Sequence, residues 1–154
     1  MAEEQKAPEF SILRVYNKDI SLETPNLPQI FKEEFKPETN LDLDIKNTLI
    51  DENEKIYEVV LRITVTAKMG EKVGFLCEVN QAGLFHIDNL APEQLDGFLN
   101  AFIPGVLYPY ARETTSSLVN RATFPPLILA PINFDALYQQ RKAKEAADAQ
   151  EAAK

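Results

Sequence analysis

The sequence predicts an α+β fold in which one antiparallel sheet is covered on one face by helices. Four segments in the first half alternate apolar and polar residues with a period of two, as half-buried strands do. Short hairpin links between these segments favour antiparallel pairing. Segments with apolar residues at helical spacing follow in the second half, and they can cover one face of the sheet while leaving the other face accessible.

The four expected strands span residues 10–23, 41–46, 57–68 and 73–81. In the last of these, Leu76 and Glu78 point outward, and the residues with the protein-facing parity are Phe75, Cys77, Val79 and Gln81. The first strand is less regular because charges fall on both of its faces. There Asp19 and Glu23 share a parity with Leu13, Val15 and Asn17, opposite to Phe10, Ile12, Tyr16, Ile20 and Leu22.

Two proline-broken apolar segments interrupt this pattern. The first, 24–37, connects the first two strands, and the second, 123–138, follows the helices. Pro125, Pro126 and Pro131 exclude a regular helix in the second segment, although most of its other residues are apolar. Exposed apolar surface costs roughly 25 cal/mol per Å². We therefore expect these segments to pack under another element or to form a surface that binds an apolar chain.

The helices are expected at 92–103, ending at Pro104, at 107–122, and from Phe134 to about Gln140, with Asn133 as an N-cap. In the second helix, the small polar residues 114–117 indicate either close approach of another helix or a weakly packed surface. The Ala-, Glu- and Lys-rich end has no apolar stripe. We expect a single domain at 10–140, a disordered tail at 1–9 and a flexible tail at 141–154.

Composition argues for a soluble cytoplasmic protein that binds other proteins. The formal charge of −8 and the pI near 4.7 disfavour nucleic acid as a partner. A single cysteine, Cys77, excludes an intrachain disulfide and favours a reducing compartment. The N-terminus has no apolar signal-peptide core, and no segment is long enough to insert into a membrane.

Candidates for catalysis are few, and we expect that the protein is not an enzyme and needs no cofactor or metal. His86 is the sole histidine, and Cys77 lies on the apolar parity of a strand, where an inert buried thiol is expected. Asp42 and Asp44 share a strand face, which is more typical of a solvated face than of a metal pair. Gly70 is not part of a phosphate-binding loop, because the further glycines and the hydroxyl residue are missing.

The residues expected to point outward from the sheet can be interpreted in two ways. If the first and fourth strands are neighbours, Asp19, Glu23 and Glu78 form an acidic patch with Leu76 inside it. The alternative is ordinary solubilising charge around one exposed leucine.

The chain resembles the SecB family of bacterial export chaperones over about residues 10–138. The segments that carry this resemblance are RVYNKDIS at 14–21, YEVVLR at 57–62, FLCEV at 75–79, YPYARE at 108–113 and NFDALY at 133–138. The resemblance implies an α+β fold with a four-stranded antiparallel sheet and helices on one side. It also implies a homotetramer, built as a dimer of dimers with the long helices between the dimers.

The resemblance further implies an ATP-independent holdase that binds unfolded preproteins and passes them to the motor SecA for export. SecA binding is implied at Asp19, Glu23, Leu76 and Glu78. The resemblance also implies that the oligomer interface is sensitive to changes at four positions, which are Phe75, Cys77, Val79 and Gln81. The client-binding groove is implied at Leu27, Ile30, Phe31, Phe35, Leu41, Leu43, Tyr57, Phe134, Leu137 and Tyr138. The absence of tryptophan departs from the family pattern. The alternative function is a structural or adaptor oligomer that binds one folded partner.

Overall fold

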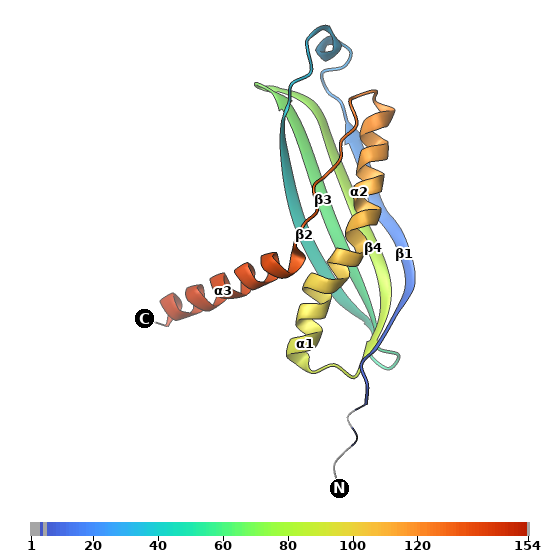
Figure 1. The fold of residues 1–154 in the computed structure, drawn as a ribbon, viewed down its shortest axis with the longest axis vertical. Coiled ribbons are helices and arrows are strands. Elements are labelled where there is room, and N and C mark those ends of the chain that lie inside the picture. The colour runs from blue at the N-terminus through green and yellow to red at the C-terminus, as the bar shows by residue number, and fades with distance from the viewer. Residues whose placement is uncertain (1–3, 5, 154) are drawn as a thin grey trace.

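The computed structural model describes residue 4 and residues 6–153 and confirms the predicted α+β fold. Four strands form one sheet, and helices lie along one of its faces, while the last helix projects away from the sheet (Figure 1). The elements are β1 (Glu9–Glu23), the 3₁₀ turn η1 (Gln29–Lys32), β2 (Glu38–Asp51), β3 (Ile56–Met69), β4 (Lys72–Asp88), α1 (Pro92–Gly97), the π-helical turn η2 (Phe98–Phe102), α2 (Ile103–Arg121) and α3 (Phe134–Ala152).

The strand order is β1-β4-β3-β2, and every neighbouring pair is antiparallel. Two tight hairpins join β2 to β3 and β3 to β4, whereas the segment between β1 and β2 crosses over to the far edge of the sheet. β2 and β4 extend beyond the predicted ranges, because the residues at the ends of both strands also pair with β3. The sheet therefore has two edges, β1 and β2.

At two points in β1 the alternation between the two faces of the sheet is interrupted. The predicted assignment of β1 residues to faces is therefore wrong in part. The register with β4 shifts between Ile12 and Arg14 and again between Asn17 and Asp19. Each shift is a bulge that places one extra residue in the strand and reverses the faces beyond it. Val15 and Asn17 therefore share the inner face with Phe10 and Ile20, and not the face of Asp19; the inner-face set is Phe10, Ile12, Val15, Asn17, Ile20 and Leu22.

The core lies between the inner face of the sheet and α2. On β3 the inner-face residues are fully buried, and they are Val59, Leu61, Ile63, Val65 and Ala67. From the other side α2 contributes its buried face, which comprises Ile103, Leu107, Ala111, Thr115 and Val119. On β4, Gly83 is required because a Cβ there would meet the Phe85 ring at 2.6 Å. α2 lies mainly over β4 and β3, and this leaves β2 to be covered by other elements.

The helices differ from prediction at two points. Pro104 does not end the first helix, because the π-helical turn η2 precedes it and the Ile103 amide bonds the Phe98 carbonyl five residues back. Pro104 then falls in the first turn of α2, where its missing N–H is tolerated. Asn133 caps α3 as predicted, its side chain accepting a bond from the Ala136 amide at 3.0 Å.

The predicted end of the last helix near Gln140 is wrong, since α3 continues to Ala152. Its composition favours helix, and Arg141 pairs with Glu145 one turn later at 3.6 Å. The described residues 141–153 are exposed, and their flexibility stays a prediction. The predicted tail at 1–9 falls partly outside the described residues, and Glu9 already belongs to β1. Within the part of the chain that is described, no helix combines the length and apolarity required to cross a membrane.

Candidate binding surfaces

An open groove lies between the edge strand β2 and the start of α3. Its volume is about 350 Å³, and its apolar lining comprises Leu41, Leu43, Ile45, Leu137 and Tyr138, with Asp42, Asp44, Asn100 and Arg141 completing it. Leu41, Leu43 and Ile45 face inward on β2, which lies beyond the strands that α2 mainly covers, and they remain partly accessible. The structure thus brings together four of the predicted groove residues, Leu41, Leu43, Leu137 and Tyr138.

Five residues of the lining are absent from the predicted groove, and they are Asp42, Asp44, Ile45, Asn100 and Arg141. Asp42 and Asp44 were interpreted instead as a solvated strand face. Ile45 shares the parity of Leu41 and Leu43, so alternation alone could have identified it. Asn100 and Arg141 carry no such signal, because they come from the π-helical turn η2 and from the segment that was predicted to be a tail.

Two predicted groove residues belong to the core instead, and this corrects their assignment. Ile30 is only 2% exposed, and Phe134 is 5% exposed with its ring 5.7 Å from that of Tyr108. Phe134 is the first residue of α3, directly after the Asn133 N-cap, and there it packs against Tyr108 of α2. Neither side chain can contact a client in this arrangement.

A second apolar cluster forms where the two proline-broken segments meet. Phe31 and Phe35 from the crossover both pack on Phe124, with ring centroids 5.7 and 5.0 Å apart. Phe124 is buried and also packs on Phe75 of β4 at 5.2 Å. Phe31 remains 51% exposed and Phe35 is half-buried, so the cluster offers Phe31 as its most accessible aromatic side chain.

The segment after α2 runs along the sheet from the end of α2 down to the start of α3 (Figure 1). It therefore links the region of the aromatic cluster with the groove. The other predicted groove residues lie elsewhere. Leu27 packs partly buried against the core in the crossover, and Tyr57 lies at the beginning of β3, beside Leu49 and Phe85.

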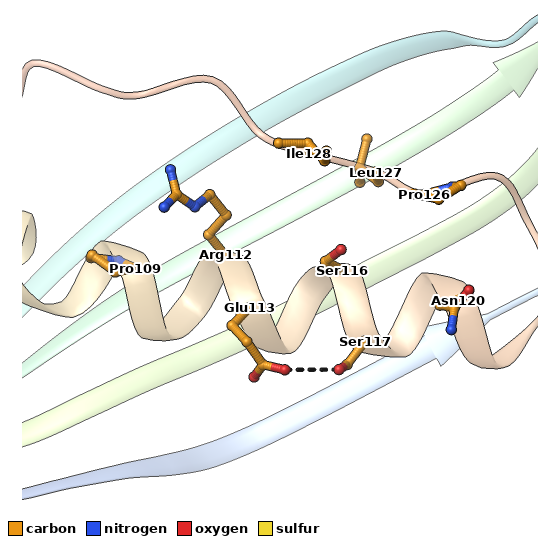
Figure 2. Close-up of a pocket in the computed structure, with 9 residues that line it drawn as sticks. All are labelled: Pro109, Arg112, Glu113, Ser116, Ser117, Asn120, Pro126, Leu127 and Ile128. Carbon is orange, nitrogen blue, oxygen red and sulfur yellow. Dashed lines mark hydrogen bonds between the residues drawn. The ribbon is translucent and has the colours of Figure 1, made fainter.

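A second cavity, of about 490 Å³, separates α2 from residues 126–128. It is lined mainly by polar side chains of α2, including Arg112, Ser116 and Ser117 (Figure 2). Ser117 donates a hydrogen bond to Glu113 at 2.9 Å, and Ile128 on the opposite wall is 82% exposed. Thr115 is fully buried and donates to the Ala111 carbonyl, so only part of the predicted small polar surface 114–117 is accessible.

The outer face of the sheet carries the four residues predicted to bind SecA. Glu23 pairs with Leu76, and Asp19 pairs with Asn80 two residues beyond Glu78, so all four point to the side opposite the helices. Asp19 and Glu23 are exposed, whereas Leu76 and Glu78 are half-buried. The strands β1 and β4 are neighbours with compatible faces, as the acidic patch requires.

A hydrogen bond crosses the outer face from β1 to β3. The Tyr16 hydroxyl donates to the Glu58 carboxylate at 2.5 Å, and Lys18 lies 3.0 Å from the same carboxylate. Ala82 of β4 lies between Tyr16 and Val60 in the pairing, and its small side chain leaves room for the tyrosine to reach across. Desolvation and the bond to Glu58 raise the pKa of Tyr16 to about 12. The bond from Tyr16 lowers the pKa of Glu58, with Lys18 adding to this.

The residues predicted for the oligomer interface are all buried within the protomer. Phe75, Cys77, Val79 and Gln81 lie on the inner face of β4, beneath α2. Their side chains are therefore covered within the protomer, and the sensitivity of assembly at these four positions stays a prediction.

The side chains considered for catalysis are buried or bonded to neighbouring groups of the protein. Burial raises the pKa of the Cys77 thiol to about 11. His86 lies 3.2 Å from Glu9 and 2.8 Å from the Glu54 carbonyl. Asp44 pairs with Arg62 at 3.6 Å. Within the described ranges, no group of three or more His, Cys, Asp or Glu residues is placed to hold a metal ion.

The fold is that of a SecB-like chaperone. The SecB-like chaperone Rv1957 of Mycobacterium tuberculosis, solved with a ChAD peptide from the Rv1956 HigA1 antitoxin, superposes with a TM-score of 0.67. It is 17% identical, and the match covers 80% of this chain and 90% of that one. A protein of unknown function from Streptococcus agalactiae matches with a TM-score of 0.45 and 14% identity, over 81% of this chain and 99% of that one.

The family is shown by a separate comparison. The family model described as preprotein translocase subunit SecB matches residues 3–145. The chain therefore belongs to the SecB family, which is a family of chaperones.

Proposed function

We propose that this protein is an ATP-independent holdase that binds unfolded precursor proteins in the cytoplasm and delivers them to the motor SecA for export across the inner membrane. Membership of the SecB family supports this proposal. The observation that carries it is the open groove, in which apolar residues of β2 and α3 stay accessible beside the edge of the sheet. An unfolded chain exposes the apolar side chains that such a groove can bury.

The groove offers two kinds of contact that do not depend on client sequence. Leu41, Leu43 and Leu137 provide burial, which is non-directional. β2 is an edge strand of the sheet, and its outer backbone groups can pair with an extended client segment. Peptide binding by the related chaperone from M. tuberculosis is consistent with this mode of action.

Assembly as a dimer of dimers would strengthen client binding. Four grooves on one assembly convert later contacts of the same client into intramolecular ones, which raises the overall affinity. The accessible polar wall of α2 at Ser116 and Ser117 is a candidate surface for contact between dimers.

Delivery to SecA would use the acidic outer face at Asp19, Glu23, Leu76 and Glu78. This face lies on the side of the sheet opposite the helices, so a bound client and a basic segment of SecA need not compete.

The test is whether the purified protein, without nucleotide, prevents a chemically unfolded precursor from refolding. We expect the yield of refolded precursor to fall as the protein is added in stoichiometric amounts, and to be independent of ATP. Normal refolding in excess protein, together with tight binding of one folded partner, would favour the alternative of a structural or adaptor oligomer.

A further inference from the structure

Asp96, in the last turn of α1, accepts hydrogen bonds from three side chains. The Tyr138 hydroxyl lies 2.5 Å from Oδ2 of Asp96, and Nζ of Lys142 lies 3.0 Å from the same oxygen. Nδ2 of Asn100 lies 3.2 Å from the other carboxylate oxygen and 2.8 Å from the Asp96 carbonyl. Two of the donors come from α3 and one from η2. The carboxylate therefore joins α3 to the helical layer.

The same network reaches β2, the strand that forms the opposite wall of the groove. Asn100 lines the groove, and its Oδ1 accepts a hydrogen bond from Nδ2 of Asn47 on β2 at 3.2 Å. A continuous path therefore runs from Tyr138 through Asp96 and Asn100 to Asn47. The two ends of this path are α3 and β2, the two elements that form the groove.

The Tyr138 ring is held between the backbone of α1 and two charged side chains of α3. A Cβ at Gly97 would lie 3.6 Å from the ring, so the ring packs directly over that backbone. The charged groups of Arg141 and Lys142 each lie about 5.6 Å from the ring centroid, in range for a cation–π interaction. With its hydroxyl bonded to Asp96, the tyrosine has both its position and its ring direction fixed.

We propose that Asp96 is a positioning residue for client binding, which holds Tyr138 and with it the α3 wall of the groove at a set distance from β2. This inference rests on the proposed function. The physical basis is preorganisation, since a wall that is already ordered loses less conformational freedom when a client binds. The bond from Tyr138, followed by that from Lys142, lowers the pKa of Asp96, so the carboxylate is ionised at neutral pH and can accept all three donors.

The test is a double-mutant cycle on client affinity. The probe is a fluorescein-labelled peptide, long enough for one groove, taken from a reduced and carboxymethylated protein that cannot refold. Asp96→Ala should weaken binding of the peptide about 5- to 10-fold, as expected when an ordered wall becomes mobile. In a Tyr138→Ala background, the same substitution should change affinity by less than about 2-fold, because Asp96 acts through Tyr138.

Two further variants and one structural readout complete the design. Asp96→Asn keeps an oxygen that can accept from Tyr138 and should recover most of the lost affinity. Glu93→Ala removes an exposed carboxylate from the same helix and should leave binding unchanged. Amide exchange across 134–142 should be about 10-fold faster in Asp96→Ala and unchanged in Glu93→Ala.

Several outcomes would overturn the inference. Faster exchange of α3 with unchanged peptide affinity would show that the wall does not need to be held. Tighter binding would show that α3 obstructs the groove, and equal losses in the two backgrounds would show that Asp96 does not act through Tyr138. A wild-type protein that fails to bind the peptide would instead overturn the proposed function, and the exchange measurement would still report whether Asp96 holds α3.

Discussion

Truncation of Leu137 gives a direct test of the groove. Leu137 is 42% exposed in the free protein and lies in the groove wall. Complete burial of a leucine side chain contributes roughly 1.5–3 kcal/mol. A client that covers the remaining 42% would gain about 0.6–1.3 kcal/mol from this side chain, so Leu137→Ala should weaken binding about 3- to 8-fold.

The assay is fluorescence anisotropy with a short unfolded peptide that spans one groove, so that several grooves in one assembly do not mask the loss. Ile50→Ala is the matched control. Ile50 lies on the same edge strand β2, is 54% exposed and does not line the groove. Its truncation removes a similar apolar area but should leave the peptide affinity within experimental error of the wild type.

Equal affinities for wild type and Leu137→Ala would refute the assignment of this groove to clients. Equal losses in Leu137→Ala and Ile50→Ala would refute it in another way, because the effect would then follow exposed apolar area anywhere on the protein. The unfolding midpoint of each variant should be recorded, since a half-exposed leucine contributes little to the core.

Three more results are expected. Leu76→Arg combined with Glu78→Lys should abolish SecA binding in a surface-capture assay while client holding persists, because both residues lie on the outer face; joint loss would argue against separate surfaces. Cys77→Phe should destabilise the protomer by about 1–3 kcal/mol by overpacking beneath α2 and should shift the proposed tetramer toward dimers in sedimentation. An unaltered sedimentation profile would contradict this. The hydrogen bond to Glu9 raises the pKa of His86, so this pair stabilises the fold fully below about pH 6.5 and progressively less as pH rises through the raised value. Glu9→Gln should therefore flatten the dependence of the unfolding midpoint between about pH 6 and 8, and an unchanged slope would show that another group is responsible.

The sheet was largely predictable because β3 and β4 are interior strands. Each has one face under α2 and one face outward, so period-two alternation reports burial directly, as Cys77 and Glu78 illustrate. β1 was predicted less well because it is an edge strand with two bulges. Its inner face is only partly covered, and the bulges near Leu13 and Lys18 interrupt the period on which the prediction depends.

The groove was half predictable, for a similar reason. Leu41 and Leu43 follow from alternation, but the accessibility of a residue in an irregular segment depends on tertiary packing. That packing buries Phe134 and leaves Leu137 accessible three residues later. The Asp96 network escaped prediction entirely, because it joins residues 42 positions apart in sequence through side chains that show no periodic pattern.

The tyrosine that reaches across β4 has a consequence for the rim of the sheet. A peripheral strand usually peels away from one end, and the opening travels along it. Tyr16 is hydrogen-bonded to Glu58 on β3, two strands away. Separation of β1 from β4 that begins at either end of β1 should therefore stop near Tyr16, at the middle of the strand. The two halves of β1 on either side of Tyr16 should therefore open separately from each other.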